Sequence, residues 1–117
     1  MKHIKLKDAE IFKKPTATVF EYHLPNKDIN WALVDVKGRY PESGWARNNE
    51  CKLMVYIVKG KGKLVVTGGG VIKFKKHDLV FVDAKTKYYW QANSRLGIAC
   101  NPAWNPEQYE SVGDGDS

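Results

Sequence analysis

The feature that most limits the fold of this chain is a series of short apolar runs separated by glycine-rich turns, with no stretch of helical periodicity. The clearest turn is Gly68-Gly69-Gly70, which lies between the runs 63–67 and 71–74 and predicts a hairpin. The other expected strands cover residues 4–6, 20–24, 29–37, 51–58, 79–82 and 96–100. Short strands at such regular spacing predict an all-β sandwich or jelly-roll barrel.

Several local signals are interpreted as strand ends and turns. Gly38 is expected to end the run 29–37, and Lys59-Gly60-Lys61-Gly62 is expected to form a turn between two strands. His77 precedes Asp78 at a tight turn and is predicted to adopt unusual backbone angles. Residues 107–110 are predicted to form one helical turn.

The length fits a single compact domain. A chain of 117 residues has a common single-domain size and can bury a modest core. The strand pattern is not repeated, so one barrel domain is predicted over residues 1–111. Residues 112–117, rich in glycine and aspartate, are predicted to form a flexible acidic tail.

A cytoplasmic protein without a membrane partner is expected. No run approaches the about 18 apolar residues of a membrane helix, and the charged residues 1–5 do not resemble a signal peptide. Cys51 and Cys100 form no C-x-x-C pair, so they are expected to be reduced and packed.

The net charge of +6 raises the possibility of a nucleic-acid partner, because basic surfaces bind phosphate backbones. The basic residues are mostly lysines that alternate along predicted strands, as in 59–63 and 73–75, where they are expected to face water. No motif typical of nucleic-acid binding accompanies them, so no nucleic-acid partner is expected.

Residues 54–66 and 76–90 resemble the two motif regions of the cupin superfamily in spacing and strand pattern. In that family the motifs read G-x5-H-x-H-x3,4-E-x6-G and G-x5-P-x-G-x2-H-x3-N, and their histidines and glutamate hold one metal ion. The resemblance implies a cupin-type jelly-roll barrel, also called a double-stranded β-helix.

The motif positions that hold the metal in that family carry no histidine here. Counting back from Gly60 places the first-motif ligands at Arg47, Asn49 and Leu53, whereas counting forward from Gly38 places them at Gly44, Ala46 and Glu50. In the second motif, Tyr88 occupies the histidine position. Arginine stays protonated and leucine has no donor atom, so neither a metal nor another cofactor is expected.

Aromatic residues are frequent in the segments that correspond to the cavity lining of the family. Tyr88 and Trp90 share strand parity and should project to the same face. The expected ligand-binding residues are Arg47, Asn49, Tyr88, Trp90, Trp45 and Trp104. Flat rings with an arginine and an amide suit a sugar, a sugar acid or another small carboxylate. The alternative is that these rings fill the space that the metal would occupy.

The favoured function is metal-free binding of a small polar ligand without catalysis, and the alternative is an enzyme like the metal-independent sugar epimerases and isomerases of the wider cupin group. The catalytic residues are not assigned. His23 is interpreted as a solvent-facing or edge residue, which leaves Tyr88, Glu42 or Glu50 as bases. A tyrosine with an ordinary pKa near 10 is a poor base.

A homodimer is expected, because cupin-like barrels commonly pair faces and the predicted strand around Ile4 and Leu6 is too short to be stable alone. If such strands exchange between subunits, removal of residues 1–14 is predicted to shift the dimer equilibrium.

Overall fold

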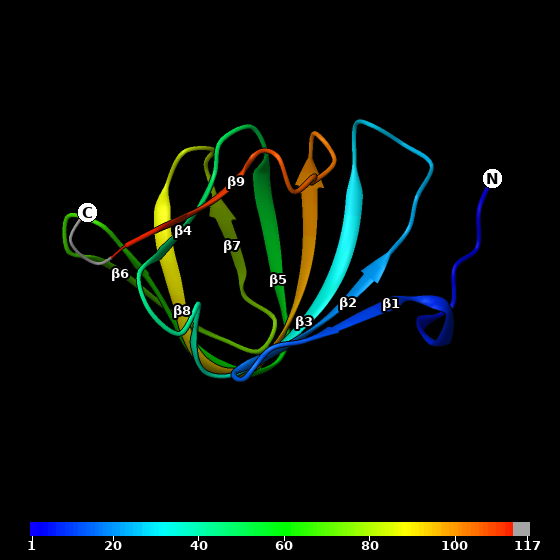
Figure 1. Ribbon diagram of the computed structural model, residues 1–117. Helices are drawn as coiled ribbons and strands as arrows, with labels where there is room; N and C mark the ends of the chain where they lie inside the picture. The colour runs from blue at the N-terminus through cyan, green and yellow to red at the C-terminus, as the bar shows by residue number, and fades with distance from the viewer. Residues whose placement is uncertain (114–117) are drawn as a thin grey trace.

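The computed structural model describes residues 1–113, which form one strongly curled antiparallel sheet (Figure 1). A single turn of 3₁₀ helix, η1 (Leu6–Asp8), precedes the sheet. The strands in chain order are β1 (Glu10–Lys13), β2 (Ala17–Tyr22), β3 (Asn30–Tyr40), β4 (Trp45–Asn48), β5 (Lys52–Val66), β6 (Gly70–Lys75), β7 (Leu79–Val82), β8 (Lys87–Asn101) and β9 (Tyr109–Val112). The predicted all-β class is confirmed.

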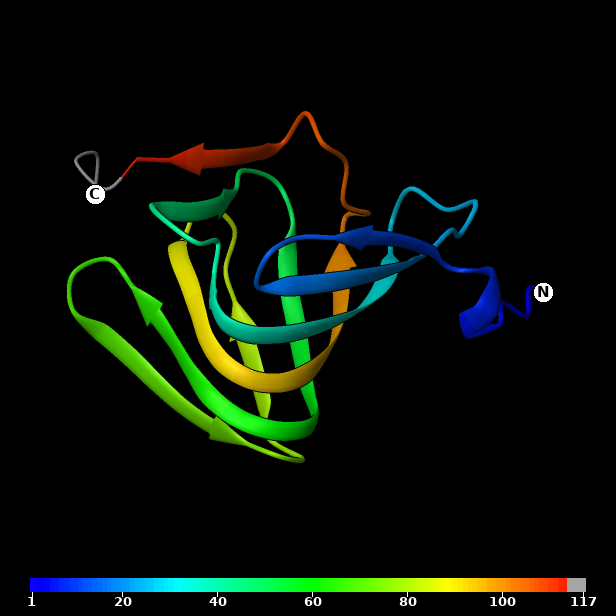
Figure 2. The ribbon, with the colours of Figure 1, turned by 60° about the horizontal axis from the view of Figure 1, so that its bottom comes forward.

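The long strand β8 lies at the centre of the sheet. It pairs with β3 on one side and with β5 on the other, and its first residues also pair with β4. Beyond β3 come β2 and β1, while β6 and β7 both pair with β5. Because β3, β5 and β8 bend sharply, the sheet closes into a half-barrel, and the short strands β4 and β9 cross its mouth (Figure 2).

The concave face of this sheet holds the hydrophobic core. Burial alternates residue by residue along β5 and β8, as the two-residue period of a strand requires. The least exposed side chains are Val36, Cys51, Val55, Ile57, Leu64 and Leu96. The concave face of the barrel is therefore lined by packed side chains.

Residues 59–62 do not form the predicted turn. β5 continues through them because a β-bulge between Ile57 and Lys59 bends the strand while its pairing with β8 resumes. Gly60 adopts φ 82°, and a β-carbon there would lie 2.1 Å from the carbonyl oxygen of Asn93. Only glycine permits this close approach, so the glycine marks a bend within one strand.

The bulge also reverses the alternation of β5. Before it, the even-numbered residues Met54 and Tyr56 are exposed and their odd-numbered neighbours are buried. After it, Lys61 pairs with the exposed Asn93, and Leu64 is buried. One extra residue thus moves the odd-numbered lysines of β5 to the outer face.

Other predictions about local structure were wrong. Residues 4–6 form no strand, and the first strand begins at Glu10. Gly38 has φ 111° but lies inside β3, which continues to Tyr40. The predicted helical turn at 107–110 is met only in part, because residues 106–108 form a turn and residues 109 and 110 belong to β9. β9 pairs with β4 and ends at the buried Val112, so the chain is still ordered where the tail was predicted to begin. The rest of the predicted tail, 114–117, lies outside the described residues.

The remaining turn predictions are confirmed. Gly68 and Gly69 have φ 88° and 90° at the tip of the β5–β6 hairpin, and His77 has φ 77° before β7. Leu79–Val82 matches the expected strand. Within residues 1–113, no helix is long and apolar enough to cross a membrane.

Candidate functional site

Tyr88 and Trp90 lie side by side on the concave face, as their shared parity predicted. Both are buried, and their ring centroids are 5.9 Å apart in an edge-to-face arrangement. The Phe74 ring also packs edge-to-face against Trp90, with ring centroids 5.8 Å apart. Their proposed role in ligand binding stays a prediction.

A chain of buried hydrogen bonds connects Tyr88 to the mouth of the barrel. Asn48 Nδ2 donates to the Tyr88 hydroxyl at 3.1 Å, and Asn48 Oδ1 accepts from Trp104 Nε1 and Gln108 Nε2, both at 3.0 Å. Gln108 Oε1 accepts from the backbone N–H groups of Glu50 and Cys51. These bonds hold residues 103–109, here called the strap, over the mouth.

Burial decides the protonation state of the phenol in this network. It raises the pKa of Tyr88 far above its ordinary value, because the charged form would lose its hydration. Burial likewise raises the pKa of Tyr40 and Tyr109. Tyr88 therefore stays protonated at neutral pH and can exchange hydrogen bonds with a ligand, but it cannot act as a base.

Asn48 was not among the predicted site residues, and strand parity explains why. Along β4, Ala46 and Asn48 are buried and face the interior, whereas Trp45 and Arg47 are half-buried and face away. When the motif positions are counted back from Gly60, they fall on residues 47 and 49, whose side chains point outward. When they are counted forward from Gly38, one of them falls on Ala46, whose side chain faces the interior. The register that settles the parity, Ala46 opposite Tyr88, joins residues 42 positions apart in the sequence.

The predicted convergence of Arg47 and Asn49 with Tyr88 is wrong. Both side chains lie on the outer side of β4, where Glu110 Oε2 accepts from Arg47 Nη2 at 2.7 Å and from Asn49 Nδ2 at 3.2 Å. These bonds lower the pKa of the Glu110 carboxyl. The guanidinium group is held by a carboxylate outside the barrel because residue 47 differs in parity from Asn48.

The two other tryptophans occupy different places. Trp104 belongs to the strap and lies at the mouth, as predicted, with its ring centroid 6.0 Å from that of Tyr109. Trp45 lies outside the barrel, where its ring contacts Tyr89 at 5.3 Å. The Arg39 guanidinium covers the same tyrosine at 3.9 Å. Only Trp104 of this pair is placed to contact a ligand at the mouth.

Cys51 and Cys100 are free and buried, as predicted. The Cys100 thiol hydrogen-bonds to Cys51, which raises the pKa of Cys100 because that bond and burial both retain its proton. The same bond lowers the pKa of Cys51 because it stabilises the thiolate. The pair lies close enough to Tyr88 and Glu21 to interact with both electrostatically.

A histidine and two carboxylates line the open rim of the concave face. Glu10 on β1 lies opposite Glu21 on β2, and Glu21 lies opposite Ala32 on β3. Ala32 and its partner Ile98 pack against the core, so this row of residues faces the concave side of the sheet. His23 Nε2 lies 2.7 Å from Glu10 Oε1. His23 is exposed, as predicted, but this contact places it on the rim of the barrel. The other proposed bases, Glu42 and Glu50, are exposed loop residues.

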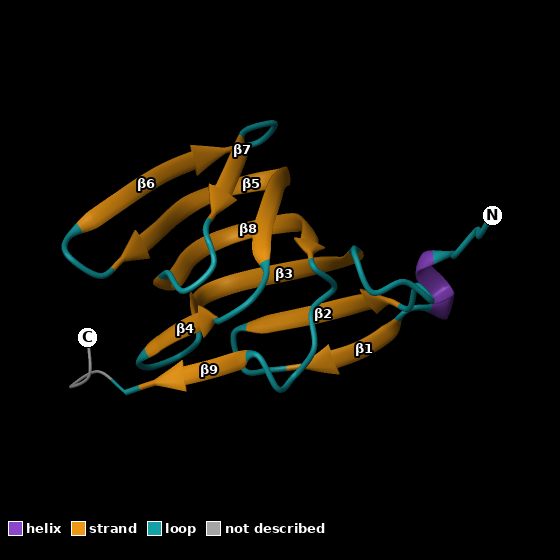
Figure 3. Ribbon diagram, turned by 90° about the horizontal axis from the view of Figure 1, so that it is seen from above, coloured by secondary structure: helices purple, strands orange, loops and turns teal. Residues whose placement is uncertain are grey.

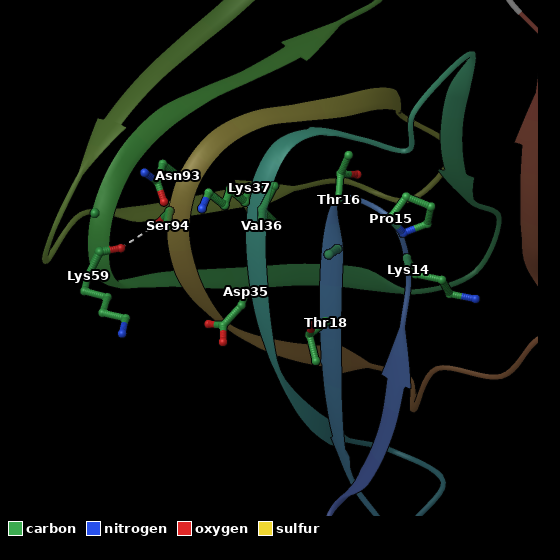
Figure 4. A pocket seen from close by; sticks show the side chains of 12 residues that line it. Lys14, Pro15, Thr16, Thr18, Asp35, Val36, Lys37, Lys59, Asn93 and Ser94 are labelled. Carbon is green, nitrogen blue, oxygen red and sulfur yellow. Dashed lines mark hydrogen bonds between the residues drawn. The ribbon is translucent and has the colours of Figure 1, made fainter.

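One hollow lies away from this mouth, at the bend of β3, β5 and β8 (Figure 4). It has a volume of about 600 Å³ and is bordered by Thr18, Asp35, Lys37, Lys59 and Asn93 among others. Ser94 at its edge donates to the carbonyl oxygen of Lys59 at 2.7 Å. The hollow is open, and its lining is polar and apolar in similar measure, so it does not enclose a small molecule.

The donor atoms at the mouth do not match the histidine and glutamate ligands that hold the metal in the cupin motifs. The side chains that face inward there are Ala46, Asn48, Cys51, Leu53 and Tyr88. Within residues 1–113, no group of three or more histidine, cysteine, aspartate or glutamate side chains is placed to hold a metal ion. A protonated phenol and an amide are weak ligands for a transition metal.

Comparisons with known proteins identify the fold. No family model matches the chain, and no curated protein matches it in sequence. Among solved structures, Streptomyces PAC13 with uridine is 17% identical, with a TM-score of 0.87 over 97% of this chain and 91% of that chain. Another structure of PAC13, which is described there as a nucleoside dehydratase, has a TM-score of 0.88 at 17% identity over 97% of this chain and 92% of that chain.

Two further structures share the fold. Ectoine synthase from P. lautus is 17% identical, with a TM-score of 0.76 over 100% of this chain and 96% of that chain. An RmlC-like cupin protein from Desulfovibrio desulfuricans is 17% identical, with a TM-score of 0.67 over 89% of this chain and 99% of that chain. Likeness at such low identity establishes the architecture and leaves the activity open.

Proposed function

Because this chain has the fold of the cupin superfamily, we propose that it binds a small, uncharged polar ligand at the mouth of the barrel without a metal or other cofactor. The observation that carries the proposal is the pair of buried amides, Asn48 and Gln108, beneath the strap. Amides offer both donors and acceptors, which hydroxyl-rich and heterocyclic molecules can satisfy.

The charges around the mouth favour an uncharged ligand over a sugar acid. In the described part of the chain, the buried polar side chains are Asn48, Ser94 and Gln108, none of which is charged. Glu10 and Glu21 add negative charge at the rim, and Arg47 is paired with Glu110 outside. An anion would therefore lose its hydration without gaining a cation.

Binding requires residues of the strap to exchange hydrogen bonds with Asn48 for hydrogen bonds with the ligand. The strap is tied to Asn48 through Trp104 and Gln108, so ligand hydroxyl or amide groups would replace one or both of these bonds. Trp104 and Tyr109 would then offer flat faces to a ring. A nucleoside or a neutral sugar has the required chemistry, and the uridine bound to the similar PAC13 is a molecule of this kind.

The proposed binding needs no metal, because the inward donors suit an organic ligand better than a cation. We expect it to take place in the cytoplasm. The buried thiols Cys51 and Cys100 are free, as a reducing compartment would keep them.

Calorimetric titration with uridine, a neutral hexose and the corresponding uronic acid tests the proposal. We expect uridine or the hexose to bind and the uronic acid to bind at least tenfold more weakly. Replacement of Asn48 by Leu should weaken binding at least tenfold, since each lost hydrogen bond costs about 1 kcal/mol and two or more depend on this side chain. The matched control Asn93→Leu removes an exposed amide on the outer face and should not change binding.

Two outcomes would overturn the proposal. Preferred binding of the uronic acid, lost in Arg47→Ala, would restore the ligand set expected from the sequence. Failure of every compound to bind at millimolar concentration would favour a structural or interaction module. Because Asn48→Leu leaves three partners unsatisfied, Tyr88→Phe serves as a milder second variant that removes one hydroxyl only.

A second candidate function is proton transfer without a metal, as in the epimerase-like alternative. The observation that favours it is the His23–Glu10 contact at 2.7 Å, with Glu21 opposite Glu10. A histidine oriented by a carboxylate is the usual form of a general base near neutral pH. Exchange of carbon-bound hydrogen for deuterium in D₂O, followed by NMR on each bound compound, would reveal it. Loss of exchange in His23→Gln but not in His77→Gln supports this function, and no exchange by the wild-type protein contradicts it.

A further inference from the structure

Beyond the bend of the barrel, the outer face of the sheet carries two rows of basic residues that the proposed ligand site does not use. The strands β3, β8, β5 and β6 lie side by side there in this order (Figure 3). The first row across them is Lys37, Asn93, Lys61 and Lys75, and the second is Arg39, Gln91, Lys63 and Lys73. The six lysine and arginine residues of these rows are here called the basic half.

The two rows face outward together, because residues two apart on a strand share a face. The lysines of the first row are exposed, and Arg39 and Lys63 of the second row are half-buried. Between the rows, Phe74 and Ala92 point into the core. Neighbouring strands lie about 4.8 Å apart and two residues of a strand span about 6.6 Å, so the cations of the basic half lie within about 14 by 7 Å of sheet.

This arrangement costs stability, because lysines lie directly opposite lysines in the β5–β6 pair. Lys61 is in register with Lys75, and Lys63 is in register with Lys73. Like charges at such positions repel, and among residues 1–113 these lysines form no ion pair that would offset the repulsion. An anion bound over them would turn the repulsion into attraction.

The border of the basic half at the bend carries more positive than negative charge. Asp35 there accepts two hydrogen bonds from Arg95, at 2.7 and 2.8 Å, so its charge is already balanced. Lys59 lies opposite Arg95 on the next strand, and Lys14 lines the same hollow as Lys37 and Lys59 (Figure 4). This border therefore adds positive charge to the basic half.

The turn after β6 adds charges of both signs. Asp78 Oδ2 accepts a hydrogen bond at 2.9 Å from the backbone N–H of the last residue of β6, and the exposed Lys76 comes two residues earlier in the chain. His77 lies between them, 2.7 Å from the Tyr56 hydroxyl, and brings no negative charge. A lysine and a carboxylate together leave the balance of this border unchanged.

The border where β3 ends and β8 begins is also balanced. Arg47 is paired with Glu110 at 2.7 Å, and Lys87 lies opposite Arg47. Glu42 lies in the loop after β3. Lys87 offsets the charge of Glu42, so in the described part of the chain no border supplies the carboxylates that would neutralise the basic half.

The chemistry of the basic half fits the backbone of a nucleic acid. Each nucleotide carries one phosphate charge, and lysines that neutralise phosphates release bound counterions, which favours association. A hollow of about 610 Å³ is lined by residues of both rows, among them Lys61, Lys63, Lys73 and Gln91. It has the volume of an ordinary ligand pocket, so a base has room there between phosphates that the two rows hold.

The curvature of the sheet favours a flexible strand over a flat or stiff surface. β3, β5 and β8 bend where Lys37 and Lys61 lie, and the core fills the concave side, so the basic half is convex (Figure 2). A bilayer is flat and a nucleic-acid duplex stays stiff over about 150 base pairs, so either would reach only part of the two rows. A single strand can follow the curve and contact both.

We propose that the basic half binds a single-stranded nucleic acid through its phosphates, with Lys61, Lys63, Lys73 and Lys75 at the centre of the contact. This proposal departs from the expectation of no nucleic-acid partner, which considered the lysines one strand at a time. The pairing of β5 with β6 and β8 brings them together. Since the basic half and the mouth of the barrel lie on opposite faces of the sheet, a small ligand and a nucleic acid would not compete.

Fluorescence anisotropy with a labelled oligothymidylate of about 12 nucleotides tests the proposal. The wild-type protein should bind it at about 50 mM NaCl, and the plot of log binding constant against log salt concentration should have a slope of about −4, because each of about six neutralised phosphates contributes about −0.7. In Lys61→Gln/Lys63→Gln the binding constant should fall at least tenfold and the slope should weaken to about −3.

The matched control is Lys5→Gln/Lys7→Gln. It removes the same charge at η1, which lies at the opposite end of the molecule from β6 (Figure 1). Its binding constant should stay within twofold of the wild-type value, and its salt slope should not change.

Circular dichroism shows whether each variant is folded, and Lys73→Gln/Lys75→Gln provides an independent disruption on β6 if the first pair is not. Failure of the wild-type protein to bind the oligonucleotide at about 50 mM NaCl would overturn the proposal, as would an equal loss in the Lys5→Gln/Lys7→Gln control. Equal or tighter binding of poly-glutamate, of vesicles that contain anionic lipid, or of the matching duplex would also overturn it, because each would assign the basic half to a different partner.

Discussion

One half of the outer surface of the sheet is apolar and the other half is basic, although β3, β5 and β8 run through both. The basic half is formed by Lys37 and Arg39 on β3, Lys61 and Lys63 on β5, and Lys73 and Lys75 on β6. The Asp35–Arg95 pair lies between the two halves. The same strands therefore present two chemically different surfaces, one apolar and one basic.

The change from one half to the other depends on the bend of β5. Up to Ile57 the strand turns apolar side chains outward, and after the bulge it turns lysines outward. Without the extra residue, Lys61 and Lys63 would face the core, where an unpaired charge is prohibitively costly. The comparison shows that a local irregularity decides the chemistry of a whole surface.

The largest expected effect is at the glycine of this bend. Gly60→Ala should destabilise the fold by about 3 kcal/mol or more, because its β-carbon meets the Asn93 carbonyl at a positive φ. Gly68→Ala is the matched control, since Gly68 has a similar φ of 88° but open space around it. It should cost only about 1 kcal/mol. Urea denaturation measures both, and equal losses would show that the bend tolerates a side chain.

The next effect is at the centre of the apolar half. A β-carbon at Gly97 would lie 2.7 Å from the ring of Trp31, which covers this glycine. Gly97→Ala should therefore tilt the indole and cost about 1–2 kcal/mol, with a red shift of the tryptophan emission. In a Trp31→Leu background the same change should cost much less. An unchanged cost in that background would mean that the ring is not the obstacle.

A smaller effect is expected at the boundary between the halves. The hydrogen bonds from Arg95 lower the pKa of Asp35 below its ordinary value, so they add stability above that value. This stability is lost as the pH falls through the lowered pKa. Asp35→Asn should cost about 1 kcal/mol or less at pH 7, because both groups are partly exposed, and almost nothing near pH 2. A cost that does not change between these two pH values would exclude the ion pair as its cause.

The smallest effect is in the basic half and has the opposite sign. Lys63 lies directly opposite Lys73 in the β5–β6 pair, and like charges at such positions repel. Lys73→Glu should stabilise the fold by about 0.5 kcal/mol at low ionic strength and less in concentrated salt. The same change at Lys52, which lies opposite Asp83, should destabilise it. Stabilisation by both changes would indicate that only net charge matters.

Much of the fold could be predicted because its signals are local. The β5–β6 hairpin follows from three consecutive glycines, and the inward positions of Tyr88 and Trp90 follow from the two-residue period of an uninterrupted strand. The site could be predicted only in part. Arg47 and Asn49 were assigned from a count that crosses the loop between β4 and β5, and such a count carries no information about strand parity.

The surfaces were harder to predict than the core. The expectation of no nucleic-acid partner rested on lysines spread along the sequence, and it stays a prediction, since the sheet brings Lys37, Lys61 and Lys75 into one row. His23 illustrates the same difficulty. Its exposure could be predicted, but its contact with Glu10 depends on the pairing of β1 with β2.

An all-β barrel with packed thiols could be predicted for this chain because alternation and glycine turns act over a few residues. Two features emerged only from the folded chain: Asn48, and not Arg47, reaches Tyr88, and the outer surface divides into an apolar and a basic half. Both depend on the register between distant strands and on one bulge. A shift of one residue turns every following side chain to the opposite face, and no local pattern records that shift.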